Sequence, residues 1–286
     1  MEPVEAVPEL KVWAGGGLCE ESEAQVSLLD HGITVGDAVF ETVAVRGGTA
    51  LSLTRHLARM VRSCQGLGIP APDVAQLRQA ALDVVAANSL DGGVLRIIHT
   101  SGPGPLGSQR GDRLPTTAIL AGPARHWDDT ADVAVVAWPR NERAATAGLK
   151  TTSYAENVIA LAEAHRRGCS EAIFANTAGS LCEGSGTNVF VGIDGVLVTP
   201  PLSSGCLAGV SRGLLIERCG LQVEERDLPI EALVGCDEAF LTSATRDVQP
   251  IRAVDDRVLA SCPGPLTQRA AEAYRRLQEG EPDPAP

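Results

Sequence analysis

Lys150 stands out among the residues that could do covalent chemistry. The 286-residue chain has 24 basic residues, and only two of them, Lys11 and Lys150, are lysines. A guanidinium stays protonated and cannot form an imine, whereas an amine can lose its proton and attack a carbonyl carbon. A lysine kept in a chain that otherwise uses arginine can therefore mark a position where only an amine serves, and chance is the competing explanation.

Composition and charge argue against several classes of partner. The net charge of -12 repels phosphate backbones and anionic lipid head groups, and no cluster of Lys and Arg offsets it locally. We therefore expect neither nucleic acid nor membrane as a partner. The stretch from Met1 to Lys11 has no apolar run, and nowhere do about 18 apolar residues follow one another. These features predict a cytoplasmic location.

The eight cysteines do not form a metal-site pattern. They contain no CxxC pair, and no histidine stands at zinc-like offsets from them. We expect no metal. Because the chain is long enough to bury a core and shows no signal peptide, reduced thiols are expected rather than disulfides.

Periodicity predicts strands and helices in both halves of the chain. Strands are expected near 11–14, 39–45, 94–99 and 117–121, and helices over 52–66 and 74–88. The second half predicts strands at 133–138, 171–176, 181–192, 195–199, 238–243 and 248–254, and helices from 153, over 209–219 and over 266–278. Ser153 and Glu156 have the spacing of a capping box, which places Lys150 just ahead of a helix.

Glycine and proline at 122–123 suggest a boundary between two mixed domains. We expect an N-terminal α+β domain over 1–122 and a C-terminal α+β domain over 123–280. The polar, proline-rich stretch 281–286 is expected to be a loose tail.

Six blocks of sequence resemble the class IV aminotransferases, and they span nearly the whole chain in the correct order. The family includes branched-chain and D-amino-acid aminotransferases and 4-amino-4-deoxychorismate lyases. The resemblance implies the two-domain α+β fold of fold-type IV enzymes, with pyridoxal 5'-phosphate in the interdomain cleft and commonly a homodimer. The blocks are 30–37 (DHGITVGD), 55–59 (RHLAR), 148–157 (GLKTTSYAEN), 182–188 (CEGSGTN), 209–212 (GVSR) and 240–250 (FLTSATRDVQP).

The resemblance assigns roles to individual residues. Lys150 carries the cofactor as a Schiff base and moves a proton between substrate and cofactor, and Glu183 faces the pyridine nitrogen and keeps the ring protonated. Leu207 packs on the ring, and Tyr154 resembles a tyrosine that bonds the ring hydroxyl, although it stands one residue closer to the lysine. The residues expected around the phosphate are Arg59, Gly209, Val210, Ser211, Ser243 and Ala244, of which Ala244 offers only its N–H.

The choice of reaction depends on short motifs. Residues 100–107 resemble the glycine-rich loop of the lyases most, and residues 35–40 fit lyases and D-amino-acid enzymes better than branched-chain ones. This resemblance predicts release of pyruvate from 4-amino-4-deoxychorismate by β-elimination, leaving p-aminobenzoate for folate synthesis. The alternative is a branched-chain or D-amino-acid aminotransferase that uses a 2-oxo acid acceptor. A homologue that only binds is disfavoured because both Lys150 and Glu183 are present.

The partner of the substrate carboxylate is open. Two positions that carry arginine in many relatives are Ser101 and Ala44 here. The candidates for this contact are therefore His31, Arg96, Arg110 and Arg246.

Overall fold

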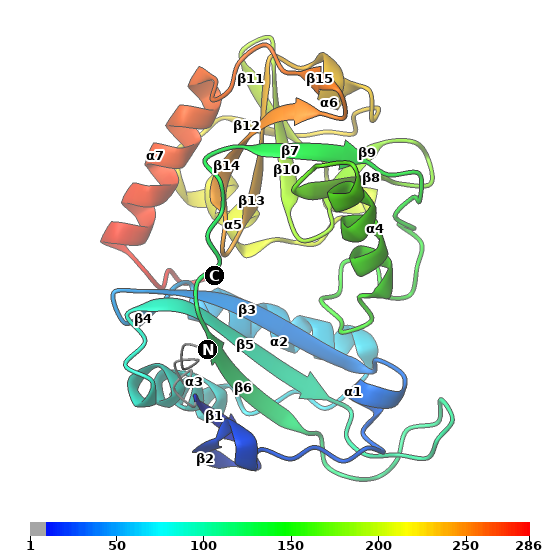
Figure 1. Ribbon diagram of the computed structural model, residues 1–286, viewed down its shortest axis with the longest axis vertical. Helices are drawn as coiled ribbons and strands as arrows, with labels where there is room; N and C mark the ends of the chain where they lie inside the picture. The colour runs from blue at the N-terminus through cyan, green and yellow to red at the C-terminus, as the bar shows by residue number, and fades with distance from the viewer. Residues whose placement is uncertain (1–9) are drawn as a thin grey trace, which may run out of the picture. The chain divides into compact units, whose positions relative to one another are not determined.

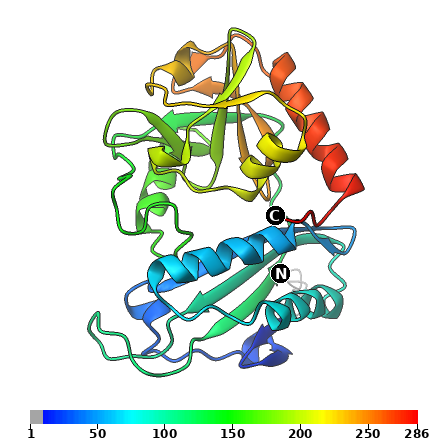
Figure 2. The ribbon, with the colours of Figure 1, turned by 180° about the vertical axis from the view of Figure 1, so that it is seen from behind.

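The computed structural model describes residues 10–286 and divides into two compact units (Figures 1 and 2). The first unit runs to Arg125 and includes Lys150–Thr152 and Ala285–Pro286, and the second comprises His126–Leu149 and Ser153–Pro284. Both units combine helices with a sheet, which confirms the predicted α+β class. The predicted boundary after residue 122 did not anticipate that residues 150–152 belong to the first unit. Residues 1–9, part of the stretch searched for a leader, lie outside the described residues.

A six-stranded sheet with antiparallel neighbours forms the first unit, in the order β2-β1-β6-β5-β3-β4. The turn between β1 and β2 uses positive φ at Gly15 and Gly16, and the second strand of this hairpin was not predicted. The strands are β1 (Lys11–Ala14), β2 (Gly17–Glu20), β3 (Ala38–Arg46), β4 (Thr49–Ala50), β5 (Gly92–Thr100) and β6 (Thr117–Gly122).

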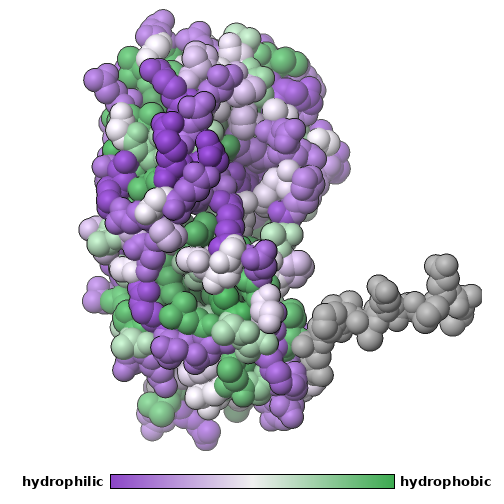
Figure 3. Space-filling model, turned by 90° about the vertical axis from the view of Figure 1, so that its left-hand side faces the viewer, coloured by the Kyte–Doolittle hydropathy of each residue, from purple (hydrophilic) through white to green (hydrophobic). Residues whose placement is uncertain are grey.

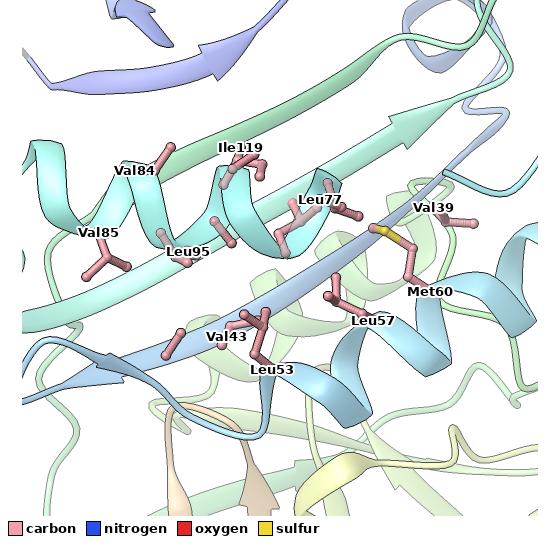
Figure 4. Packing of buried hydrophobic residues seen from close by; sticks show 14 of the residues in the cluster. Val39, Val43, Leu53, Leu57, Met60, Leu77, Val84, Val85, Leu95 and Ile119 are labelled. Atoms are coloured by element: carbon pink, nitrogen blue, oxygen red, sulfur yellow. The ribbon is translucent and has the colours of Figure 1, made fainter. Parts of the chain in front are cut away.

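Two helices cover one face of this sheet, α2 (Leu53–Leu67) and α3 (Val74–Ala87), as Figures 2 and 4 show. Their buried leucines, valines and Met60 pack on Val39 and Val43 of β3 and on the neighbouring strands. Because side chains alternate along a strand, Glu41 lies on the same face as these valines. A carboxylate therefore stands in an apolar layer. The remaining helical turns are Glu21–Glu23 and α1 (His31–Thr34).

The second unit is built on a nine-stranded sheet with the order β12-β11-β10-β13-β14-β7-β8-β9, and β15 pairs with β14. The single strand predicted over 181–192 is two strands, because the backbone turns at Ser185–Thr187. The strands are β7 (Ala131–Val135), β8 (Glu171–Ala175), β9 (Leu181–Gly184), β10 (Asn188–Ile193), β11 (Val196–Thr199), β12 (Val223–Glu225), β13 (Glu238–Ser243), β14 (Asp247–Val254) and β15 (Arg257–Val258).

Four α-helices and one 3-10 turn complete the second unit. Phe190 of β10 and Phe240 of β13 stack with ring centroids 4.8 Å apart and form one core with α5 and α7. The exposed side of α7 carries charged residues, and it forms part of the hydrophilic surface in Figure 3. The helical segments are α4 (Ala155–Arg166), Leu202–Ser204, α5 (Val210–Arg218), α6 (Ala232–Gly235) and α7 (Pro265–Gly280).

Two local predictions were wrong. The N-cap of α4 is Tyr154, without a side-chain cap hydrogen bond, rather than Ser153. Glu156 pairs instead with Arg140, whose Nη1 lies 2.8 Å from its Oε2, so a charged partner replaces the capping box. The tail is tied down: Arg55 Nε donates to Ala285 O at 3.0 Å.

All eight cysteines are free thiols. Between residues 10 and 286 no helix is long and apolar enough to cross a membrane, and no group of three or more His, Cys, Asp or Glu is placed to hold a metal ion.

Candidate active site

The backbone of Lys150 is held on both sides within the first unit. Its N–H donates to Ser63 Oγ of α2 at 3.1 Å, and its carbonyl accepts from the N–H of Phe40 in β3 at 3.1 Å. Thr151 next to it forms a β-bridge with Val39. The segment 150–152 thus lies beside β3 as a short additional strand. The Lys150 amine lies 4.3 Å from the centroid of the Phe40 ring.

Arg59 takes part in a buried ionic cluster. Its Nε donates to Glu41 Oε1 at 2.9 Å and its Nη2 donates to Glu41 Oε2 at 2.7 Å, while His56 Nδ1 lies 2.7 Å from the same Oε2. All three residues are at least 95% buried. Positions 56, 59 and 63 share one face of α2, because helical neighbours recur every three to four residues. The same face therefore holds Arg59 and the backbone of Lys150.

The charges in this cluster shift two pKa values. Burial alone would raise the pKa of Glu41, but the charge and hydrogen bonds of Arg59, with the hydrogen bond of His56, hold it well below its usual range. Burial lowers the pKa of His56, Glu41 opposes that shift, and the positive charges of Arg59 and Lys150 add to it. His56 is consequently neutral at pH 7 and Glu41 is ionised.

Sequence reasoning missed Glu41 and His56, although a signal was present. Glu41 interrupts the apolar run AVFETVAV, and His56 recurs with Arg59 at a helical spacing inside a predicted core helix. A charged residue at a core position indicates a buried partner, since an isolated buried charge is very costly. The contact between Arg59 and the cofactor phosphate stays a prediction. The structure shows that Glu41 holds the Arg59 guanidinium in one orientation.

Arg96 shares an aromatic neighbour with the lysine. It lies on β5 opposite Thr42 of β3, and its guanidinium carbon is 4.3 Å from the centroid of the same Phe40 ring that the Lys150 amine contacts. The side chain is exposed. Of the four residues considered for a substrate carboxylate, Arg96 is thus the one whose contacts in the first unit bring it near the candidate catalytic amine.

Two other candidates for the substrate carboxylate, His31 and Arg110, help to hold the glycine-rich loop at residues 100–107 in place. His31 Nε2 lies 2.8 Å from Pro105 O, and Arg110 binds both carboxylate oxygens of Asp37 at 2.6 and 2.7 Å. Arg110 also donates to the carbonyls of Leu67 and Gly68, and its hydrogen bonds lower the pKa of Asp37. These bonds give both residues a role in holding the loop, while His31 Nδ1 is buried without a hydrogen-bond partner among the described residues. The contact of either residue with a substrate carboxylate stays a prediction.

Arg246, the fourth candidate, is bound within the second unit. Its guanidinium stacks 3.6 Å from the centroid of the Trp127 ring, and its Nη2 lies 3.3 Å from Glu171 Oε2. Nη1 donates to Gln249 Oε1 at 2.5 Å. Because this buried arginine neutralises a buried carboxylate, the structure gives it a stabilising role in the second unit, and the expected substrate contact has no support.

Glu183 of β9 has its carboxylate fixed from two sides. Leu207 N–H donates to Glu183 Oε2 at 2.8 Å, and Arg140 Nε lies 3.1 Å from Glu183 Oε1. Arg140 itself lies over Phe174, with its guanidinium carbon 4.2 Å from the ring centroid. Sequence reasoning did not single out Arg140. The structure therefore brings Glu183 and Leu207 together and adds an arginine to them, and their contacts with a cofactor stay predictions.

Helix α5 begins at Val210, three residues after Leu207. Its N-cap is Gly209, with no side-chain cap, so the first N–H groups of the helix, including those of Val210 and Ser211, form a site suited to an anion. A Cβ at position 209 would lie 1.9 Å from Asn188 Oδ1, which explains the glycine. Asn188 Nδ2 in turn donates to Leu207 O at 2.9 Å, so Leu207 and the helix start share one support.

The remaining cofactor candidates lie at the ends of elements in the second unit. Ser243 ends β13, and its Oγ accepts from the Arg246 N–H at 3.2 Å. Ala244 is in the turn that follows, and Tyr154 is at the N-cap of α4. Their contacts with a cofactor stay predictions.

Comparisons with known proteins identify the family of the whole chain. The family model for amino-transferase class IV matches residues 38–254. The D-alanine aminotransferase of Bacillus licheniformis is 30% identical, over 93% of this chain and 96% of that protein. The 4-amino-4-deoxychorismate lyase structure from Pseudomonas aeruginosa is 32% identical with a TM-score of 0.82, covering 94% of this chain and 99% of that one.

A third relative is the branched-chain amino acid aminotransferase of Thermobaculum terrenum, whose structure is described as the PLP form. It is 29% identical, with a TM-score of 0.85, and covers 95% of this chain and 94% of that one. Such likeness over nearly full length confirms the fold predicted from the six blocks. The chain belongs to the class IV aminotransferase family of pyridoxal-phosphate-dependent transferases and lyases.

Proposed function

We propose that this chain binds pyridoxal 5'-phosphate through Lys150 and uses it to cleave the bonds of an amino substrate. The observation that carries the proposal is the pair of bonds that fixes Glu183 beside the start of α5. This donor set fits the cofactor: a carboxylate suits a protonated pyridine nitrogen, and helical N–H groups with the Ser211 hydroxyl suit a phosphate. When bound, pyridoxal phosphate supplies a ring that accepts the electron pair released at a substrate carbon.

The side chains of this protein divide the remaining tasks. Lys150 holds or moves a proton at the substrate carbon, and the bonds of its backbone to Ser63 and Phe40 fix the point from which its side chain extends. Arg140 and the Leu207 N–H keep the Glu183 carboxylate pointing in one direction. Arg59, oriented by Glu41, adds positive charge for the phosphate. Arg96 is our candidate for the substrate carboxylate.

For the reaction, we propose 4-amino-4-deoxychorismate lyase activity, in which loss of a proton and of pyruvate leaves p-aminobenzoate. The support is the lyase-like sequence at 100–107 and the 32% identity to the Pseudomonas aeruginosa lyase. Folate synthesis and a cytoplasmic location belong to this proposal. Amino transfer is a second candidate, favoured by the likeness to aminotransferases for D-alanine and branched-chain amino acids.

One pair of assays separates the two reactions. Purified protein with pyridoxal phosphate is given enzymatically prepared aminodeoxychorismate in one series, and L- and D-amino acids with 2-oxoglutarate in another. The lyase proposal expects p-aminobenzoate and pyruvate in equal amounts in the first series. Glutamate in the second series without p-aminobenzoate in the first would establish amino transfer instead. A K150A protein controls for reaction without the enzyme's amine.

We also propose that the chain forms a homodimer. Large apolar side chains are exposed around α1 and the glycine-rich loop, among them Leu28 at 82%, Leu106 at 80% and Leu114 at 85%. The two segments are joined by a bond from the Gly104 N–H to Leu29 O. Clustered apolar surface of this kind is typical of protein interfaces. Sedimentation of the wild type and of L106E tests this, since a monomeric wild type would contradict it.

A further inference from the structure

The C-terminal helix reaches the proposed phosphate site through one hydrogen bond. Tyr274 of α7 donates its hydroxyl to Ser211 Oγ of α5 at 2.8 Å. Both residues are 97% buried, since each keeps only 3% of its exposure. Ser211 is the second residue of α5, so the bond ends at the very start of the helix that we assign to the phosphate.

The position of Tyr274 follows from the pattern of α7. Thr267, Ala270, Ala273 and Tyr274 form the buried side of this helix, and its charged residues face outward. The tyrosine ring packs in the core that contains Phe190 and Phe240. A buried phenol needs a partner for its hydroxyl, and here that partner is a serine rather than a backbone group.

This bond restricts what the Ser211 hydroxyl can do. A serine hydroxyl donates one hydrogen bond and accepts up to two. With Tyr274 donating to its oxygen, the serine hydrogen must point elsewhere, and the donated bond also strengthens it as a donor. A serine in the first turn of a helix otherwise tends to turn its hydrogen toward a nearby backbone carbonyl. Tyr274 therefore favours a serine that donates to an outside acceptor.

We propose that Tyr274 is a positioning residue for the cofactor phosphate, acting through the hydroxyl of Ser211. This inference rests on the proposed binding of pyridoxal phosphate at the start of α5. It extends the cofactor site to α7, a helix that comes after every residue of the sequence motifs. Pyridoxal, which has the aldehyde but not the phosphate, is the probe that separates this positioning role of Tyr274 from a merely structural role.

The test measures dissociation constants of the full-length protein, freed of cofactor, for pyridoxal phosphate and for pyridoxal by absorbance titration. The proteins are wild type, Y274F, S211A and the double variant. T267V is the matched control, because Thr267 is on the same buried side of α7 and its hydroxyl has no hydrogen-bond partner. Unfolding temperatures are recorded for all five proteins without cofactor.

We expect Y274F to weaken pyridoxal phosphate binding about three- to tenfold, the usual value of one neutral hydrogen bond, and to leave pyridoxal binding unchanged. The double variant should bind no more weakly than S211A alone, and T267V should bind as the wild type does. A Y274F protein with wild-type affinity for pyridoxal phosphate, or with equal losses for both probes, would overturn the inference. So would wild-type affinity in S211A. A wild-type protein that does not bind pyridoxal phosphate would instead overturn the proposed function itself.

Discussion

The Arg59 guanidinium meets the Glu41 carboxylate edge to edge, with Nε 2.9 Å from Oε1 and Nη2 2.7 Å from Oε2. A two-point pair of this kind fixes the plane of the guanidinium as well as its position. Glu41 is fully buried, so each charge of the pair needs the other as its counter-ion. The residue that we assign to the phosphate is thus oriented by a carboxylate that interrupts the apolar face of β3.

Removing the charge of Glu41 should destabilise the protein strongly. E41Q leaves Arg59 buried without a counter-ion, which typically costs about 3–5 kcal/mol. Urea unfolding measures this loss. E279Q is the matched control, because it removes one partner of the exposed Arg275 pair on α7, and it should unfold as the wild type does. Equal stability of E41Q and wild type would show that the buried pair does not exist in solution.

His56 should make the protein sensitive to mild acid. Its pKa in the folded protein is below the ordinary value of 6.5, so below about pH 6.5 the unfolded chain takes up a proton that the folded protein excludes. The free energy of unfolding should therefore fall as the pH drops from 7 to 5. In H56Q this fall should be smaller. H99Q is measured beside H56Q, because burial also lowers the pKa of His99 and the contribution of each histidine to the fall must be separated. The account fails here if H56Q and wild type lose stability in parallel.

Arg140 should affect the cofactor rather than the fold alone. R140M removes the cation that forms an ion pair with Glu183 at 3.1 Å, in a place where both side chains are largely buried. We expect kcat to fall about 10- to 100-fold, with a change in the absorbance spectrum of the bound cofactor. Arg143 is 89% exposed and provides the control variant R143M, which should keep both properties. An unchanged spectrum and kcat in R140M would remove Arg140 from the site.

Arg96 should act on the substrate. R96M should raise KM about 10- to 100-fold, because a carboxylate loses a charged partner. The affinity for pyridoxal phosphate should stay the same. R257Q, a change at an exposed arginine of the second unit, is the control. A normal KM in R96M would return the carboxylate contact to an unidentified residue.

Local features made much of the fold predictable. The long strands and helices follow from the apolar runs of β3 and β5 and from helical spacing in α2 and α7. The short strand β2 and the division of 181–192 were missed, since two glycines and a three-residue turn change direction without changing hydrophobicity. The capping box at Ser153 failed because Glu156 had a better partner in Arg140, a residue 16 positions away.

The candidate site, like the fold, could be predicted from local motifs but not from contacts between distant residues. Lys150 and Glu183 could be predicted because each stands in a recognisable motif, and Leu207 because it lies three residues before Val210. Glu41 lies 18 residues from Arg59, and Tyr274 lies 63 residues from Ser211. Such pairs form only when strands and helices pack, so the sequence can mark a charged residue at a core position but does not say which residue is its partner. Arg246 does stand in a motif, but the motif did not reveal that its partner is the buried Glu171.

The most direct test of the account asks whether Lys150 holds the cofactor. Protein supplied with pyridoxal phosphate is treated with borohydride, which makes an imine bond permanent, and its peptides are weighed. We expect the adduct on the peptide with Lys150, and none on the peptide with Lys11, the only other lysine. K150A should lose the cofactor absorbance and K11A should keep it. Colourless wild-type protein without an adduct at Lys150 would contradict the account.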